Sequence, residues 1–153
     1  MDDVKKILAV SRSTKQCNRV VQYGVSLAKK YSAELYVIRV IHDPFSMEGW
    51  NLPIPYLREE YEKFMQDAKA ELDKIVEAEK KRGFAIKVFV RDGKPMDEIL
   101  AVIEREGIDL LLLLAHDEGR MEHLLFGRTN EELVRRMPCS LFLLKSAPAP
   151  DEP

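Results

Sequence analysis

The chain has 153 residues, of which 24 are basic and 26 acidic, and its formal net charge is -2. That length suits one domain with a sizeable core. The near balance of charge gives no general attraction to nucleic acid or to an anionic membrane, so neither is predicted as a partner.

The first predicted elements form a β-α-β unit. Val4 to Val10 and Ala33 to Ile41 are short, apolar and β-branched, as expected of buried strands. The residues between them repeat apolar side chains at three- and four-residue spacings, which predicts a helix. Ser13 or Thr14 is its expected cap.

A long loop and a long helix are expected next. Residues 42–55 contain three prolines and a glycine, which exclude a continuous helix or central strand. Phe45, Met47 and Trp50 in this loop either form an apolar patch for a protein partner or fold back over the core. From Tyr56 to about Arg82 the apolar spacing again predicts a helix.

The second half of the chain repeats the alternation of strand and helix. Ala85 to Val90 is predicted as a strand, Pro95 to Arg105 as a helix, and Asp109 to Ala115 as a nearly all-leucine strand. Such a strand belongs in the middle of a parallel sheet that is covered on both faces. A helix from about Asn130 to Met137 and a strand from Cys139 to Lys145 complete the pattern.

This order predicts an α/β fold with an open, doubly wound parallel sheet and helices on both faces. Residues 1–146 are expected to form the domain and residues 147–153 a flexible, proline-rich tail. Ligands in such folds bind beyond the carboxyl ends of the strands, so the residues that follow the first, second and fourth strands are the candidates for chemistry.

Four segments resemble the universal stress protein family: KKILAV at the first strand, GKPMDEIL at Gly93 to Leu100, IDLLLLLAH at Ile108 to His116, and LLFGRTNEELVRRMPCSLFLLK at Leu124 to Lys145. The resemblance implies a flavodoxin-like or Rossmann-like five-stranded sheet in the order 3-2-1-4-5. It also implies a cytoplasmic role in stress tolerance and a homodimer through the final strand. The cysteine usage, without a C-x-x-C pair, fits the cytoplasm as well.

One branch of that family binds ATP through an aspartate after the first strand and a loop of the form G-x2-G-x9-G-[ST]. Gly127 matches the last glycine, but Leu114 and Asp117 stand at the other two glycine positions. Arg128 replaces the small hydroxyl residue, and Arg12 stands where the aspartate would be. Side chains and acidic charge in the loop oppose a triphosphate, which argues against the usual mode of ATP binding.

The candidate ligand crevice consists of five residues that follow the first and fourth strands: Arg12, His116, Gly127, Arg128 and Thr129. Each has a structural alternative. Thr129 forms a T-x-x-E capping box with Glu132, and Gly127 suits a turn with positive φ. Arg12 could pair with Asp117 or Glu118 instead of an anion.

No enzyme class is indicated by the motifs. The sequence lacks G-x-S-x-G, H-E-x-x-H and paired cysteines, and His116, Asp117, Glu118 and His123 lack the spacings of metal ligands. We therefore predict a binding or regulatory module with no catalytic residue, metal or cofactor.

Two alternatives stay open. One is a nucleotide sensor or slow ATPase that binds ATP through Gly127 and the helix after it, and the other is a receptor for a small anion at Arg12 and Arg128. In every case we expect a homodimer through Cys139 to Lys145, because an open apolar edge strand invites pairing with another chain.

Overall fold

The computed structural model describes residues 3–11, 17–41, 54–115 and 135–145. Its elements alternate along the chain as β1 (Lys6–Val10), α1 (Cys17–Tyr31), β2 (Glu34–Ile41), α2 (Ile54–Lys80), β3 (Ile86–Asp92), α3 (Pro95–Glu106), β4 (Leu110–Ala115) and β5 (Ser140–Lys145). All five predicted strands are confirmed, as are the first three helices. Of the predicted fourth helix, residues 135–137 lie in the described part of the chain; residues 135 and 136 are helical, but Met137 is not, so the helix ends one residue earlier than predicted. The predicted tail and the loop with Phe45, Met47 and Trp50 lie outside it.

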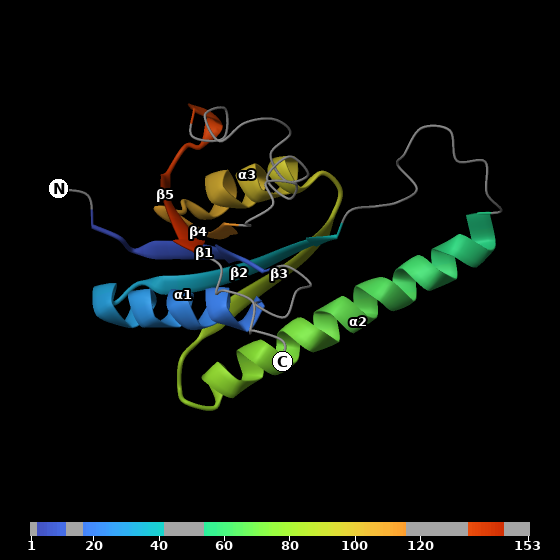
Figure 1. The fold of residues 1–153 in the computed structure, drawn as a ribbon, viewed down its shortest axis with the longest axis horizontal. Helices are drawn as coiled ribbons and strands as arrows, with labels where there is room; N and C mark the ends of the chain where they lie inside the picture. Colours follow the sequence, from blue (N-terminus) through green and yellow to red (C-terminus); the bar gives the residue numbers. More distant parts are fainter. Residues whose placement is uncertain (1–2, 12–16, 42–53, 116–134, 146–153) are drawn as a thin grey trace, which may run out of the picture.

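The five strands form one parallel sheet in the order β3-β2-β1-β4-β5, which confirms the predicted order. Figure 1 shows α1 and α2 on one face of this sheet and α3 on the other. The chain first moves outward from β1 to β3 and then crosses to β4 on the other side of β1. The strand order therefore reverses at β1, so a ligand crevice is expected beyond the carboxyl ends of β1 and β4.

Two apolar layers hold the helices on the sheet. Alternate residues of the central strands face opposite sides, since side chains of a strand point up and down in turn. In β4, Leu112 and Leu114 pack toward α1 and α2, while Leu111 and Leu113 pack toward α3. The all-leucine strand thus supplies both layers, as its sequence predicted.

Helix α1 lies close to the sheet because its inner face is small. Val20, Val21 and Ala28 are buried there, with Gly24 between them. A Cβ atom at Gly24 would lie 2.9 Å from Cδ1 of Leu35 in β2. That distance is too short for two carbon atoms, so a glycine at this position lets the helix approach the strand.

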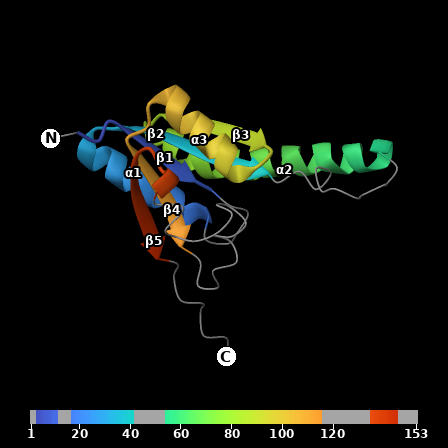
Figure 2. The same ribbon diagram turned by 90° about the horizontal axis from the view of Figure 1, so that it is seen from above.

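Helix α2 is longer than the sheet that it packs against. Leu72 and Val76, near its carboxyl end, are buried against the sheet. Its amino-terminal part extends past the sheet in both views (Figures 1 and 2). In the described part of the chain no helix has both the length and the apolar composition that crossing a membrane requires.

Helix α3 begins and ends with recognisable local signals. Proline stands in its first turn together with Asp97 and Glu98, whose charges suit the positive end of the helix dipole. Gly107 ends the helix with a φ of 69°, and the amides of Gly107 and Ile108 both donate to the carbonyl of Ile103 at 3.0 Å. Glycine adopts this left-handed conformation without the strain that a Cβ would cause.

One predicted boundary is wrong. The third strand was predicted to end at Val90, before the turn-forming sequence RDGKP, but Arg91 and Asp92 continue β3. They pair with Val40 and Ile41 of β2, so β3 runs as far as its neighbour does. Pairing with a long partner strand overrides the weak turn preference of these two residues.

Candidate functional site

The predicted crevice lies at the carboxyl ends of β1 and β4. Its five candidate residues, Arg12, His116, Gly127, Arg128 and Thr129, lie outside the described residues, and their roles stay predictions. The described residues that border them are Ser11 after β1, Arg39 near the end of β2, and Leu114 near the end of β4.

Ser11 is buried directly after β1. Its amide donates to the carbonyl oxygen of Ile38 at 2.8 Å, which extends the pairing of β1 with β2 by one residue. Its hydroxyl oxygen accepts a hydrogen bond from Nη2 of Arg39 at 3.2 Å. The first residue of the loop after β1 is therefore held by both the main chain and a side chain of β2.

Arg39 places a positive charge near the carboxyl ends of β1 and β2. Its side chain points to the same face as Leu35 and Val37 and is only 3% exposed. Nη1 lies 3.5 Å from Oε2 of Glu71, a carboxylate of α2 whose side chain is 54% exposed. A buried guanidinium is costly unless polar groups compensate it, and here Ser11 and Glu71 do so. The three residues tie the loop after β1 to β2 and α2.

Sequence reasoning missed Arg39. The signal was available, because in ELYVIRVI an arginine occupies a position that the alternation of the strand assigns to the core. A charged residue at a core position indicates a buried polar network. The partner residue Glu71, 32 positions away on a mostly exposed helix, carried no such signal.

Leu114 lies inside the sheet and not in the loop after it. It is paired with Leu144 of β5, and its side chain is 5% exposed in the layer under α1 and α2. The ATP-binding motif would have a glycine here. In this chain the position contributes a full leucine side chain to the core.

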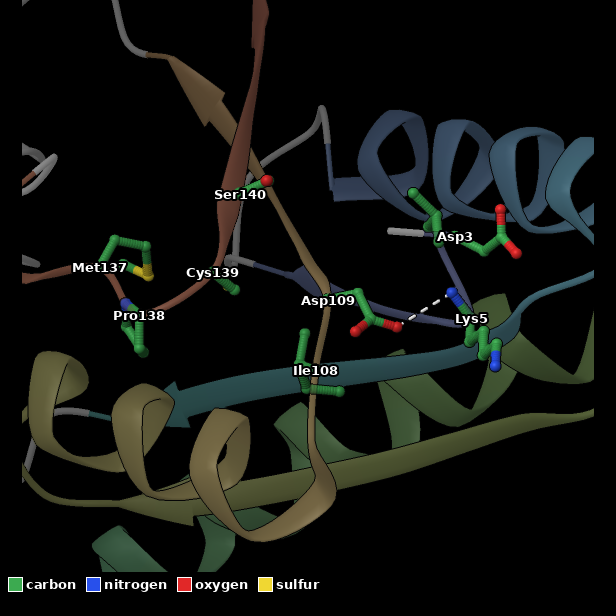
Figure 3. Close-up of a pocket in the computed structure, with 9 residues that line it drawn as sticks. Asp3, Lys5, Ile108, Asp109, Met137, Pro138, Cys139 and Ser140 are labelled. Atoms are coloured by element: carbon green, nitrogen blue, oxygen red, sulfur yellow. Dashed lines mark hydrogen bonds between the residues drawn. The ribbon is translucent and has the colours of Figure 1, made fainter. Parts of the chain in front are cut away.

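A hollow of about 750 Å³ lies at the amino-terminal ends of the strands, where β1, β4 and β5 begin (Figure 3). Its lining combines Asp3, Lys5, Asp109 and Ser140 with the apolar Ile108 and Met137. One carboxylate oxygen of Asp109 accepts hydrogen bonds from the amides of Lys5 and Lys6, each at 2.9 Å. These bonds engage the carboxylate in joining strands, which gives Asp109 a structural role.

Cys139 lines the same hollow. Burial is the main cause that raises the pKa of its thiol, and the charge of Asp109 adds to this, while a hydrogen bond with the backbone of Leu111 opposes it. A raised pKa leaves less of the reactive thiolate at neutral pH. Within the described ranges, no three histidine, cysteine or carboxylate side chains gather as metal ligands would.

Comparison with known proteins identifies the family. Residues 3–145 match the sequence profile of the universal stress protein family, which is almost the whole chain. The chain belongs to the universal stress protein family. Universal stress protein MJ0531 of Methanocaldococcus jannaschii is 26% identical over 146 residues, which cover 92% of this chain and 82% of that protein.

Solved structures share the fold. The hypothetical protein MJ0577, also from Methanocaldococcus jannaschii, superposes with a TM-score of 0.70 at 20% identity and covers 97% of this chain and 100% of its own. A universal stress protein family protein of Arabidopsis thaliana, solved with AMP bound, has a TM-score of 0.59 at 14% identity and covers 94% of this chain and 92% of its own. At these identities the structures establish the sheet and its order.

Proposed function

We propose that this universal stress protein is a cytoplasmic binding or regulatory module that performs no catalysis and does not bind ATP in the usual mode of its family. The observation that carries the proposal is the position of Leu114. Its side chain belongs to the core and its backbone to β4, so the flexible glycine that would open the phosphate loop is replaced by a strand residue.

The residues around the crevice add a charge argument. Arg12 stands where the resemblance expects an acidic residue, and Arg39 places a second cation beneath the same edge. An adenine amino group or ribose hydroxyl needs an acceptor, which a guanidinium does not supply. The negative charge of Asp117, which stands at a glycine position of the motif, would in turn oppose the phosphates.

Calorimetric titration of the full chain with ATP and magnesium tests the proposal. We expect no measurable heat of binding at micromolar protein. The triple variant Arg12→Asp/Leu114→Gly/Asp117→Gly restores three family residues and should gain binding, whereas Arg82→Asp/Asp73→Gly, which alters exposed sites elsewhere, should not. A micromolar dissociation constant for the unaltered chain would refute the proposal.

A second function is a nucleotide sensor or slow ATPase, and the AMP bound to the related Arabidopsis protein favours it. In this chain Gly127 and the helix that follows would have to provide the phosphate contacts, because helix amides attract anions. The same titration with AMP separates this possibility from ATP binding. Release of phosphate from ATP, measured with and without Gly127→Val, would show whether hydrolysis occurs at that glycine.

A third function is the binding of a small anion at Arg12 and Arg128, and the buried Arg39 favours it. Its guanidinium contributes positive potential beside Ser11, the residue that precedes Arg12 in the chain. Inorganic phosphate should then raise the melting temperature of the chain. The rise should vanish in Arg12→Ala/Arg128→Ala, and an equal rise in that variant would eliminate the site.

The proposed assembly is a homodimer through β5. This strand lies at the edge of the sheet, and Phe142 and Leu143 are 38% and 49% exposed there, one on each face. Two neighbouring apolar side chains beside an open strand edge favour pairing with a second copy, which would cover them.

Sedimentation equilibrium tests the dimer. The unaltered chain should have twice the mass of one protomer, and Phe142→Lys/Leu143→Lys should be a folded monomer. Tyr31→Lys is the matched control, because Tyr31 is an exposed apolar side chain on α1, away from β5. A monomeric unaltered chain would contradict the proposed interface.

A further inference from the structure

The sheet has a second edge, formed by β3. This strand pairs with β2 along its whole length, from Ile86 opposite Leu35 to Asp92 opposite Ile41. Within the described residues no strand pairs with its other side. In the described part of the chain, the amide and carbonyl groups of β3 that point away from β2 thus pair with no strand and could pair with a further one.

Three side chains at alternate positions of β3 lie on the α3 face of the sheet. Phe89 packs into the layer beneath α3, and its ring stacks on that of Tyr36 with centroids 6.2 Å apart and planes 3° from parallel. The ammonium of Lys87 lies 5.5 Å from the centre of the Tyr36 ring. The guanidinium of Arg91 lies 5.2 Å from the centre of the Phe89 ring. We call Lys87, Phe89 and Arg91 the β3 triplet.

Within the described residues, the two cations of the β3 triplet take part in no ion pair with an acidic side chain. Among the residues that the structure describes, the ion pairs join Arg39 with Glu71, Arg82 with Glu79 and Arg105 with Glu106. Lys87 and Arg91 take part in none of these. Arg91 donates to the carbonyl of its neighbour Val90 at 3.3 Å.

A third cation lies close by, since the guanidinium of Arg105 from α3 is 5.5 Å from the centre of the Phe89 ring. Its own charge is met by Glu106, with Arg105 Nε 3.4 Å from Glu106 Oε1. Tyr36 likewise donates to Glu34 at 2.7 Å. Among the described residues, the positive charge without an acidic partner near the Phe89 ring therefore belongs to Lys87 and Arg91 of β3, next to the open edge.

The charges also indicate which occupant fits. If β3 of a second copy paired here, lysine and arginine side chains would stand opposite like charges, which destabilises strand pairing. A segment with acidic side chains would instead place opposite charges across the pair. An apolar side chain between them would lie beside Phe89.

We propose that the open edge of β3 binds an extended acidic segment of a partner protein as an added strand, with acidic, apolar and acidic side chains at alternate positions beside Lys87, Phe89 and Arg91. Main-chain hydrogen bonds would supply affinity and the β3 triplet would supply specificity. This inference deepens the proposed regulatory function by naming its partner class. It is separable from that proposal, since it involves neither the crevice nor β5.

Fluorescence anisotropy with three labelled peptides tests the inference on the full chain. The first peptide contains the core Glu-Thr-Val-Thr-Glu, the second Lys-Thr-Val-Thr-Lys, and the third Glu-Pro-Val-Pro-Glu. We expect the first to bind and the second not to. The third keeps the charge, but its two prolines remove two backbone amides and fix φ at about −65°, so it should bind much more weakly.

Variants connect binding to the β3 triplet. Lys87→Glu/Arg91→Glu should lower the affinity for the acidic peptide by about tenfold or more and raise the affinity for the lysine peptide. Lys69→Glu/Lys74→Glu, on the exposed side of α2, makes the same change of net charge and should bind the acidic peptide like the unaltered chain. Urea denaturation verifies folding, and Lys87→Gln/Arg91→Gln replaces the charge reversal if that variant is unfolded.

Several results would overturn the inference. These are no binding of the acidic peptide, equal binding of the proline peptide, or an unchanged affinity in a folded variant of Lys87 and Arg91. An equal loss of affinity in the α2 control would assign the binding to overall charge and would likewise reject the β3 edge.

Discussion

Lys6 and Asp109 are joined by two hydrogen bonds, although 103 positions separate them in the chain. The amide of Lys6 donates to the carboxylate of Asp109, and the amide of Asp109 donates to the carbonyl of Lys6, both at 2.9 Å. The carbonyl of Asp109 also accepts from the amide of Ser140 at 3.2 Å. One aspartate thus joins the beginnings of β1, β4 and β5.

Asp109→Ala should lower the free energy of unfolding by about 1–3 kcal/mol, because the amides of Lys5 and Lys6 lose their acceptor. Asp109→Asn should lower the free energy of unfolding less, since the side-chain amide oxygen can still accept these hydrogen bonds. Urea denaturation at neutral pH measures both. Asp73→Ala on exposed α2 is the control, and an equal loss there would show that the bonds of Asp109 add no stability.

The effect of replacing Arg39 on the free energy of unfolding should depend on which residue takes its place. Arg39→Ala leaves a cavity and unpaired polar groups, so we expect a loss of about 2–4 kcal/mol. Arg39→Met fills the space without a buried charge, so its free energy of unfolding should fall clearly less. Chemical denaturation compares the two variants, and equal losses would show that the polar contacts, not the volume, are what the core requires.

Glu71→Gln tests the other end of this network. The Glu71 side chain is largely exposed and 3.5 Å from Arg39, so its charge should contribute less than about 1 kcal/mol. A loss above that in urea denaturation would mean that Glu71 is the main compensation of the buried guanidinium. Glu62→Gln, exposed on the same helix, is the matched control.

Tyr36 should make stability depend on alkaline pH. Burial, followed by the hydrogen bond to Glu34, raises the pKa of Tyr36 to about 12. In the unfolded chain tyrosine titrates near pH 10, so the unfolded state loses its proton first. This contribution is complete below about pH 10 and is lost as the pH rises from about 10 to about 12.

Tyr36→Phe should therefore flatten the decline of the unfolding free energy over that range, while Tyr31→Phe, at an exposed site, should not. Absorbance of tyrosinate in the folded protein gives a direct reading. The component that titrates latest should disappear in Tyr36→Phe only. If Tyr36 titrated with the exposed tyrosines, the assigned environment would be incorrect.

Gly24→Val should destabilise the protein by about 1–3 kcal/mol or more, because a branched side chain would overlap Leu35 and push α1 from the sheet. Ser26→Val introduces the same side chain on the exposed face of α1 and should change stability by well under that amount. Thermal unfolding compares them. Equal melting temperatures would mean that the helix can move away from β2 without loss of packing.

The fold could be predicted because local and global preferences agree. The strands of the described chain are apolar runs, the helices carry apolar stripes, and Gly83 and Gly107 follow helices with positive φ. The leucines of β4 predicted burial on both faces, which the two core layers confirm. The end of β3 was predicted wrongly, because its length depends on pairing with β2.

The alternation of strands and helices, the family and the expected place of a crevice could be inferred from the amino-acid sequence alone, since they follow from hydrophobic period and local motifs. Only the tertiary structure brought Arg39 to Ser11 and Glu71, joined Asp109 to the start of β1, and set Lys87 and Arg91 beside an open edge. The physical reason is that these contacts join side chains from separate elements, and no periodicity within one segment encodes its neighbours across the sheet.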